Sequence, residues 1–222
     1  MGADENSPMH RATFGHCFRR TLAVGAGAVS IVSAECSKVE AFEHFPHPAH
    51  LPWNHKRVFG TIDMASARRG YEVYKQVCKA CHSMKWIAYR HLVGNIMSEE
   101  EAKAEAAAVT VPDIDEAAKA ANGGAFPPDL SMLLLTREGA EDYVFSLLTS
   151  YVETPAGVKL DEGKYYNPYF PDGVISMPQQ LFDGGIEYKD GTPATASQQA
   201  KDICTFMRWT AEPFMRKRRG CF

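Results

Sequence analysis

The segment Val77-Cys78-Lys79-Ala80-Cys81-His82 constrains this chain more than any other part of its sequence. Two cysteines three residues apart, followed at once by a histidine, form the attachment sequence of a c-type haem. On a helical turn, residues i and i+3 share one face, so Cys78 and Cys81 can bond both vinyl groups of one porphyrin. His82 can then reach the iron as the proximal ligand.

Two other chemistries use a Cys-x-x-Cys pair, namely thioredoxin-like dithiols and zinc sites. A dithiol site is typically preceded by a strand, whereas the residues before Cys78 have a helical pattern. A zinc site needs a second pair of ligands, and no other Cys-x-x-Cys or His-x3-5-His follows. The adjacent histidine therefore favours haem. The other four cysteines are far apart and indicate no disulfide framework: Cys17, Cys36, Cys204 and Cys221.

The chain has 222 residues, 45% of them hydrophobic, which suffices for one domain with appendages. Its net charge of -3 does not indicate nucleic-acid binding.

Residues 1–40 are predicted to be a targeting presequence. Met9–Ala34 contains three arginines and no acidic residue, and Thr21–Ala34 is uncharged and rich in small residues. Fourteen residues make a helix of about 21 Å, shorter than the ~30 Å hydrocarbon core of a membrane. This pattern is typical of an export or sorting signal, although Asp4 and Glu5 are unusual for a mitochondrial one. The alternative is a retained N-terminal arm.

A proline-marked segment with four histidines follows: His44, His47, His50 and His55. Such a cluster raises the possibility of a metal site. Residues separated by prolines share no helical face, so the pattern favours a polar loop on the domain surface.

The first helix is predicted to begin near Ser66, as its N-cap, and to run into the cysteine motif. Tyr71, Tyr74 and Cys78 form one apolar stripe along it. Gly70 costs about 1 kcal/mol relative to alanine in a helix, so it indicates a close backbone approach, here to the last helix.

The last helix is predicted to begin at Thr195, which forms a capping-box pattern with Gln198, and to end before Pro213. Cys204 is expected to be a small buried side chain within its apolar stripe. The stripe comprises Ala200, Ile203, Cys204 and Met207.

Three segments connect these helices. Glu99–Asn122 is alanine-rich and predicted helical, with an acidic surface that is either simply solvated or a docking surface for a basic partner. Leu130–Arg137 and Glu141–Val152 are predicted to form two helices around Gly139. Thr154–Gly191 is rich in turn residues and is predicted to be a long functional loop.

The long loop should supply the second axial ligand of the iron, since no histidine follows His91. Met177 stands alone there, immediately before the conformationally restricted Pro178. Met84 is too close to His82 to reach the opposite haem face. Two further methionines are expected in the core, Met132 and Met207. His/Met ligation leaves no open coordination site and so suits electron transfer.

Over residues 41–213 the sequence resembles the cytochrome c1 family in long segments that follow the family's order: RRGYEVYKQVCKACHSMKWIAYRHLVG, NGGAFPPDLS, EDYVFSLLT, YYNPYFPDGVISMP and DGTPATASQQAKDICTFMRWTAEP. The resemblance implies a mainly α, c-type cytochrome fold with long irregular loops around one covalently bound haem c. The haem domain would span residues 41–212.

The resemblance also implies a set of haem contacts. The thioether cysteines fall on Cys78 and Cys81, and the axial ligands on His82 and Met177. Propionate contacts fall on Arg137 and Tyr143, with Asn122 nearby and Pro128 packed by the haem. A guanidinium suits a carboxylate, although a charge at a helix end is more often merely a surface group.

By the same resemblance, the chain would be the haem c subunit of the ubiquinol–cytochrome c oxidoreductase, the cytochrome bc1 complex (respiratory complex III). It would relay electrons from the Rieske iron–sulfur protein to soluble cytochrome c, beside cytochrome b and other complex III subunits. The expected location is the mitochondrial inner membrane, with the haem domain in the intermembrane space; the bacterial periplasmic side is the second choice. Two alternatives are a free-standing c-type cytochrome and a haem sensor or peroxidase-like enzyme from which Met177 dissociates.

Two departures from the family pattern stand out. The stretch Val109–Ala121 is shorter than the family's usual insertion before Asn-Gly-Gly. Residues 213–222 form a basic stub of the kind that flanks a membrane anchor, without the ~20 apolar residues of a span. Either the sequence is cut short or partner subunits provide the anchoring.

Overall fold

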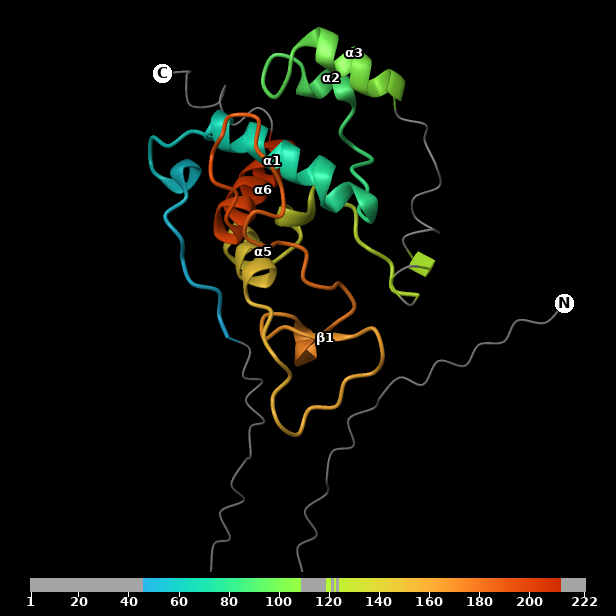
Figure 1. Cartoon of the computed structure of the whole chain (residues 1–222). Coiled ribbons are helices and arrows are strands. Elements are labelled where there is room, and N and C mark those ends of the chain that lie inside the picture. Colours follow the sequence, from blue (N-terminus) through green and yellow to red (C-terminus); the bar gives the residue numbers. More distant parts are fainter. Residues whose placement is uncertain (1–45, 109–118, 121, 123, 213–222) are drawn as a thin grey trace, which may run out of the picture. The chain divides into compact units, whose positions relative to one another are not determined.

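Two helices far apart in the sequence, α1 (Met64–Gln76) and α6 (Ala196–Ala211), lie against each other at the centre of the fold (Figure 1). The structure, a computed structural model, describes residues 46–108, 119–120, 122 and 124–212. A Cβ added at Gly70 would lie 2.1 Å from the carbonyl oxygen of Asp202 and 2.6 Å from the Cβ of Phe206. The predicted close approach of Gly70 to the last helix is therefore confirmed.

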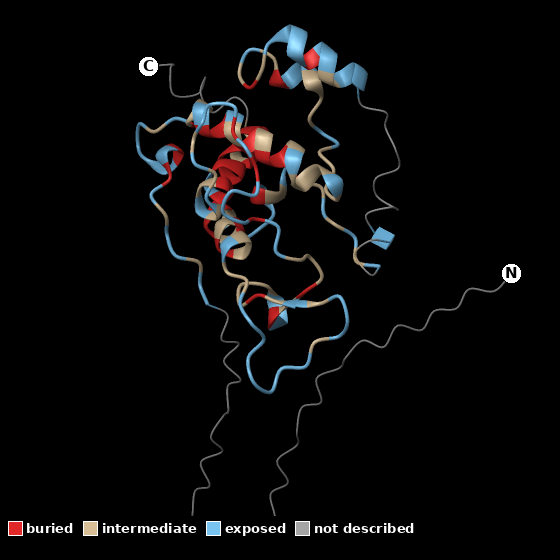
Figure 2. Ribbon diagram, viewed as in Figure 1, coloured by how far each residue is buried: buried red, intermediate tan, exposed pale blue. Residues whose placement is uncertain are grey.

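The buried face of α6 is the predicted one. Figure 2 shows buried residues concentrated along α6 and the facing side of α1. Cys204 is fully buried, as expected of a small core side chain, and its thiol faces the carbonyl of Glu141 at 3.8 Å. Thr195 caps the helix by accepting from the amide of Gln198, whose own side chain donates to Asp202 instead of completing a capping box. The predicted apolar stripe is wholly buried: Ala200, Ile203, Cys204 and Met207.

The start of α1 differs from the prediction. Asp63 is the N-cap, because its carboxylate accepts hydrogen bonds from the amides of Ala65 and Ser66. Ser66 lies inside the helix, where its hydroxyl donates to the buried carboxylate of Asp202 at 2.5 Å. The predicted cap at Ser66 was therefore wrong: this serine joins α1 to α6.

Short elements and long loops make up the rest of the described chain. β1 and β2 pair antiparallel, with Tyr165 opposite Ile175. The architecture is mainly helical with long irregular loops, as predicted. Besides α1 and α6 the elements are η1 (Asn54–Lys56), η2 (Cys78–Ala80), α2 (Tyr89–Leu92), α3 (Glu99–Ala108), η3 (Leu133–Leu135), α5 (Ala140–Thr149), β1 (Tyr165–Tyr166), η4 (Pro171–Gly173) and β2 (Val174–Ile175), where η denotes a 3-10 helix.

One predicted helix is wrong. In place of a helix over Leu130–Arg137 there is only the single turn η3. The Asp129 carboxylate accepts not only from the amide of Ser131 but also from the distant residues Ser83 and Lys85, which hold the start of this segment. Met132 is consequently 49% exposed, so its expected place in the core is also wrong. The next helix follows the predicted turn at Gly139 (φ 77°) but ends at Thr149, three residues before Val152.

The histidine-containing lead-in is only partly a surface loop. His50 is exposed, but His55 is buried with its Nε2 2.6 Å from the carboxylate of Glu141. Trp53 is also buried and donates from its ring nitrogen to Asp142 at 2.5 Å. The surface prediction was therefore wrong for His55, because that histidine pairs with an acid 86 residues later. His44 lies outside the described residues.

Glu141, at the start of α5, is fully buried among charged partners. Burial alone would raise its pKa, but hydrogen bonds from His55 and Arg208 outweigh burial and hold the Glu141 pKa far below its usual value. Lys56 adds an ion pair at 3.3 Å. These bonds fasten the lead-in and α6 to the same end of α5.

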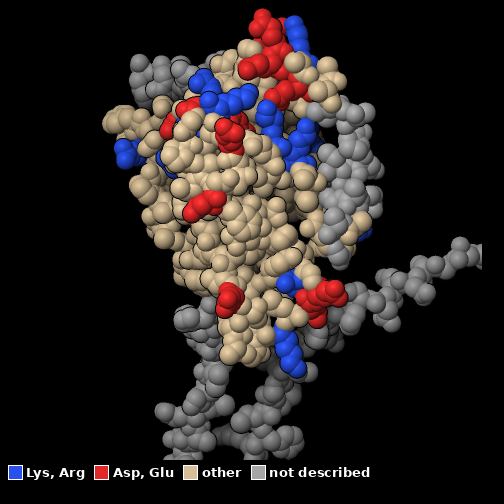
Figure 3. Space-filling view, viewed as in Figure 1, with Lys and Arg blue, Asp and Glu red and all other residues tan. Residues whose placement is uncertain are grey.

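Helix α3 joins α1 through Glu105, which accepts from the hydroxyl of Tyr71 and the ammonium of Lys75, both at 2.5 Å. Its first turn carries three glutamates, and Figure 3 shows acidic side chains gathered over this helix. Within the described ranges, no helix is long and apolar enough to cross a membrane. The predicted presequence (1–40), the basic stub (213–222) and most of Val109–Ala121 lie outside the described residues.

Candidate functional site

The cysteines and histidine of the motif lie on a tight turn directly after α1. The α-helix ends at Gln76, because Val77 has non-helical backbone angles (φ -121°, ψ -64°). The helix therefore runs up to the motif, as predicted, but the first cysteine lies on the separate 3-10 turn η2 and not on α1 itself. The turn is helical in kind, since the amides of Cys81 and His82 both donate to the carbonyl of Cys78, at 3.1 and 2.9 Å.

Both cysteines of the motif are free and half-buried. Burial raises the pKa of the Cys78 thiol to about 12, with a smaller contribution from Cys81. A dithiol redox site needs a thiolate of lowered pKa, so the environment of Cys78 does not favour that chemistry. No group of three or more His, Cys, Asp or Glu side chains is placed to hold a metal ion in the described part of the chain.

The imidazole of His82 has a defined orientation. Its Nδ1 lies 2.8 Å from the carbonyl oxygen of Pro128, which can only accept, so Nδ1 carries the proton and donates. Burial lowers the pKa of His82, while the Pro128 carbonyl opposes this shift more weakly. The neutral ring therefore keeps the lone pair on Nε2, the form in which histidine ligates a metal.

The Pro128 carbonyl is itself held in place by several hydrogen bonds between residues 83–86 and residues 129–131. Leu130 donates from its amide to the carbonyl of Ser83 at 2.9 Å. Asp129 accepts from the Ser83 hydroxyl at 2.8 Å and from the Lys85 amide at 2.7 Å. These donors outweigh burial and lower the Asp129 pKa. Sequence reasoning did not single out Asp129, although its Pro-Asp-x-Ser context is typical of a side-chain-capped turn.

Met177 follows β2 and is half-buried. Its carbonyl accepts from the hydroxyl of Tyr151 at 2.8 Å, and the preceding Ser176 accepts from Lys164 at 2.6 Å. Sequence reasoning also missed Tyr151, which no local pattern distinguishes from the other tyrosines of the chain.

The remaining predicted contacts fall on two segments. Arg137 is exposed just before α5, and its charge opposes the rise in pKa that burial gives Tyr143, which places the two side chains near each other. Asn122 is half-buried in a turn, and Pro128 is exposed beside the imidazole it holds. The structure thus joins His82 to Pro128 by a hydrogen bond, whereas Arg137 and Tyr143 interact only through the charge of the arginine. Among the described residues, no hydrogen bond joins Met177 to any of these four.

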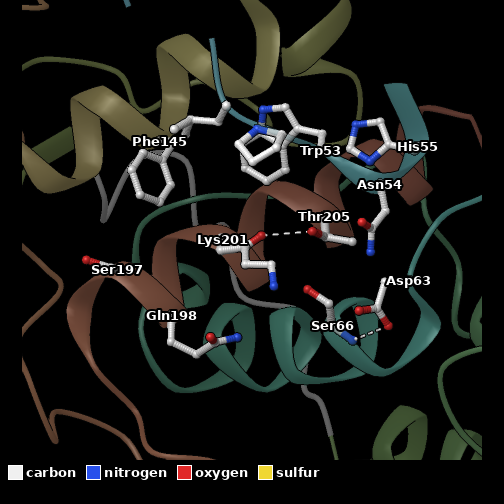
Figure 4. A pocket seen from close by; sticks show the side chains of 12 residues that line it. Trp53, Asn54, His55, Asp63, Ser66, Phe145, Ser197, Gln198, Lys201 and Thr205 are labelled. Carbon is white, nitrogen blue, oxygen red and sulfur yellow. Dashed lines mark hydrogen bonds between the residues drawn. The ribbon is translucent and has the colours of Figure 1, made fainter. Parts of the chain in front are cut away.

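A cavity of about 350 Å³ lies elsewhere, where η1, α1, α5 and α6 meet. Figure 4 shows Trp53 and Phe145 along one side of it and Ser66 and Gln198 along the other. None of the motif residues and not Met177 lines it. The cavity therefore belongs to the packing of the lead-in and not to the candidate site.

The mainly helical architecture, with a Cys-x-x-Cys-His turn and long loops, is that of the c-type cytochromes. Residues 53–116 and 114–222 match the model of the Cytochrome C1 family. The chain belongs to this family, which confirms the resemblance seen in its sequence.

Curated relatives agree with this assignment. The chain is 44% identical, over 91% of its length and 71% of the relative, to "Cytochrome c1-1, heme protein, mitochondrial" of Solanum tuberosum. It is 47% identical, over 82% of its length and 72% of the relative, to "Cytochrome b-c1 complex catalytic subunit, mitochondrial" of Candida albicans. The corresponding figures for "Cytochrome c1, heme protein, mitochondrial" of Saccharomyces cerevisiae are 45%, 82% and 67%.

Proposed function

We propose that this chain is the haem-carrying subunit of a mitochondrial cytochrome bc1 complex and relays single electrons from the Rieske iron–sulfur protein to soluble cytochrome c. The names of its relatives, as mitochondrial haem proteins and as a cytochrome b-c1 complex subunit, support this role. The observation that carries it is the hydrogen bond from His82 to the Pro128 carbonyl, because it prepares Nε2 as a metal ligand directly beside two free thiols.

The donor set fits a c-type haem. Cys78 and Cys81 would each add their S–H bond across one vinyl group, giving two thioethers without an oxidant. His82 would bind the iron through Nε2, and Met177 would provide a sulfur ligand. When bound, the haem supplies a one-electron Fe(III)/Fe(II) couple.

The chain's own residues would set the properties of that couple. The Pro128 carbonyl holds the proton on Nδ1 and so fixes the ring orientation and basicity of His82. Arg137 provides a positive charge beside Tyr143, where a propionate would be stabilised. With His82 and Met177 both as ligands, the iron would have no position left for a substrate, which is appropriate for an electron carrier.

The partners and location follow from the same proposal. The chain would assemble with cytochrome b and the other subunits at the mitochondrial inner membrane, with its haem domain in the intermembrane space. The acidic first turn of α3 is suited to attract a basic carrier protein such as soluble cytochrome c.

Pyridine haemochrome spectroscopy of the haem-loaded chain tests the attachment. We expect a spectrum with both vinyl groups saturated in the wild type, and with one restored vinyl in Cys78→Ala or Cys81→Ala. Met177→Leu should abolish the long-wavelength sulfur-to-iron charge-transfer band of the ferric protein. An unaltered band in that variant would place the second ligand elsewhere.

Purification of the native complex in detergent tests the assembly. Co-purification with cytochrome b and a Rieske protein is expected. A chain that elutes alone with its haem would instead be a free-standing c-type cytochrome. Ready binding of carbon monoxide by the ferrous protein would contradict stable methionine ligation and favour a sensor or peroxidase-like role.

A further inference from the structure

Two hydrogen bonds join the loop that carries Met177 to α5 and to the residues directly after that helix. Tyr151, which lies two residues beyond the end of α5, donates its hydroxyl proton to the Met177 carbonyl at 2.8 Å. Asn167, which is fully buried, donates from Nδ2 to the carbonyl of Leu147 within α5 at 2.7 Å. Met177 therefore lies at the end of a segment that is held at one point by α5 and at another by Tyr151, just after that helix.

The backbone between Asn167 and Met177 is itself constrained by hydrogen bonds and by a tight turn. β1 and β2 pair across it, and the amide of Asn167 donates to the carbonyl of Gly173 at 2.9 Å. Gly173 has a φ of 69°, and a Cβ there would lie 2.5 Å from the ring of Tyr166, so only glycine fits. The turn and the pairing of β1 with β2 therefore constrain the backbone that leads to Ser176 and Met177.

Two constraints then act on Met177 itself. The residue before a proline is restricted to extended backbone angles, and Pro178 follows immediately. The Tyr151 hydroxyl fixes the direction of the Met177 carbonyl, and hence the remaining rotation of that backbone. Together they restrict the backbone from which the Met177 side chain extends.

We propose that Tyr151 is a positioning residue that holds Met177 against the haem iron through the methionine's backbone carbonyl. This inference rests on the proposed function, in which Met177 is an axial ligand. Tyr151 acts without touching the iron: without its hydrogen bond, the backbone of Met177 rotates more freely and the sulfur leaves the iron more often.

The test is Tyr151→Phe in the full-length, haem-loaded chain, which removes one hydroxyl and keeps the ring. Cyanide binding to the ferric protein measures how often the sulfur dissociates, because cyanide binds only where methionine has left. We expect binding about five-fold faster than in the wild type, the factor that corresponds to one ordinary hydrogen bond. The sulfur-to-iron band should also disappear on heating well before the far-ultraviolet circular dichroism changes. Tyr165→Phe is the matched control, since Tyr165 lies exposed in β1 of the same loop.

The outcomes separate this inference from the function on which it rests. If Tyr151→Phe and Tyr165→Phe both bind cyanide at the wild-type rate, Tyr151 does not position the ligand. If the band of Tyr151→Phe is lost only together with the circular dichroism, the residue is merely structural and the inference fails. Met177→Leu is the reference: a band that persists in it overturns the proposed ligation, whereas a lost band with unaltered Tyr151→Phe overturns only the role of Tyr151.

Discussion

Replacing Gly70 by alanine tests how tightly α1 and α6 are packed. The added Cβ would lie 2.1 Å from the Asp202 carbonyl oxygen and 2.6 Å from the Cβ of Phe206. These atoms belong to the backbone and to the root of a fully buried side chain, so neither can rotate away. The two helices must separate, and the separation is transmitted along α1 towards Cys78.

The magnitude follows from two opposing effects. Alanine is favoured over glycine inside a helix by about 1 kcal/mol. Overpacking a close-packed interior costs typically ~1–3 kcal/mol, and the obstruction by backbone atoms places this site at the upper end. The net destabilisation is therefore about 2 kcal/mol. In a domain of this size 1 kcal/mol lowers the melting temperature by about 2–4 °C, so we expect a decrease of roughly 4–8 °C.

Differential scanning calorimetry of the haem-loaded protein measures this decrease. Ala65→Gly, at an exposed residue of the same helix, is the control, because it alters the helix without changing the contact between α1 and α6. A Gly70→Ala protein as stable as the wild type, or more stable, would show that the helices are free to separate and would refute the packing argument.

Further predictions concern charge. Arg137→Gln should lower the reduction potential by tens of millivolts, since it removes a positive charge that opposes the ferric form; Lys159→Gln, on an exposed loop, should leave a redox titration unchanged. Replacing the glutamates of Glu99–Glu101 by glutamine should make the rate of cytochrome c reduction depend less steeply on ionic strength, as measured by stopped flow. If the variant and the wild type show the same dependence on ionic strength, these glutamates do not take part in docking. The lowered pKa of Glu141 contributes stability that is present above its unfolded pKa of about 4.5 and is lost as the pH falls below it. Glu141→Gln should therefore have a lower free energy of unfolding than the wild type at pH 7. Between about pH 5 and pH 3 its free energy of unfolding should decrease less than that of the wild type, as measured by denaturant unfolding. If the free energies of both proteins decrease in parallel with pH, the pairing of Glu141 is contradicted.

Features with a local or periodic cause could be predicted from the sequence. The buried stripe of α6 follows from helical spacing, and the contact at Gly70 follows from the cost of glycine within a helix. The Cys-x-x-Cys-His turn was recognisable because its chemistry requires adjacent residues. Even there, the exact end of α1 at Gln76 depended on the backbone of one residue.

Features that depend on distant partners could not be predicted. His55 is buried because Glu141 gives its ring a hydrogen-bond partner, and nothing in the local sequence reveals a partner 86 residues away. The Pro128 carbonyl reaches His82 across 46 residues and involves no side chain of its own, so no motif records it. The leucine-rich run around Met132 forms only one 3-10 turn, next to Asp129, which is bonded to the distant residues Ser83 and Lys85.

The hydrogen bonds that join residues 51–56 to the first residues of α5 also limit how many N-terminal residues can be removed. Asp142 accepts from the Leu51 amide, the Trp53 ring and the Lys56 ammonium, while His55 covers Glu141. A processing peptidase that cuts before residue 50 leaves all of these bonds intact. A cut beyond Lys56 would remove all of these donors, so that Asp142 would lose its partners and Glu141 would keep only Arg208 of α6. We therefore expect the part of the chain that carries the cysteine motif to need residues 51–56 for its stability.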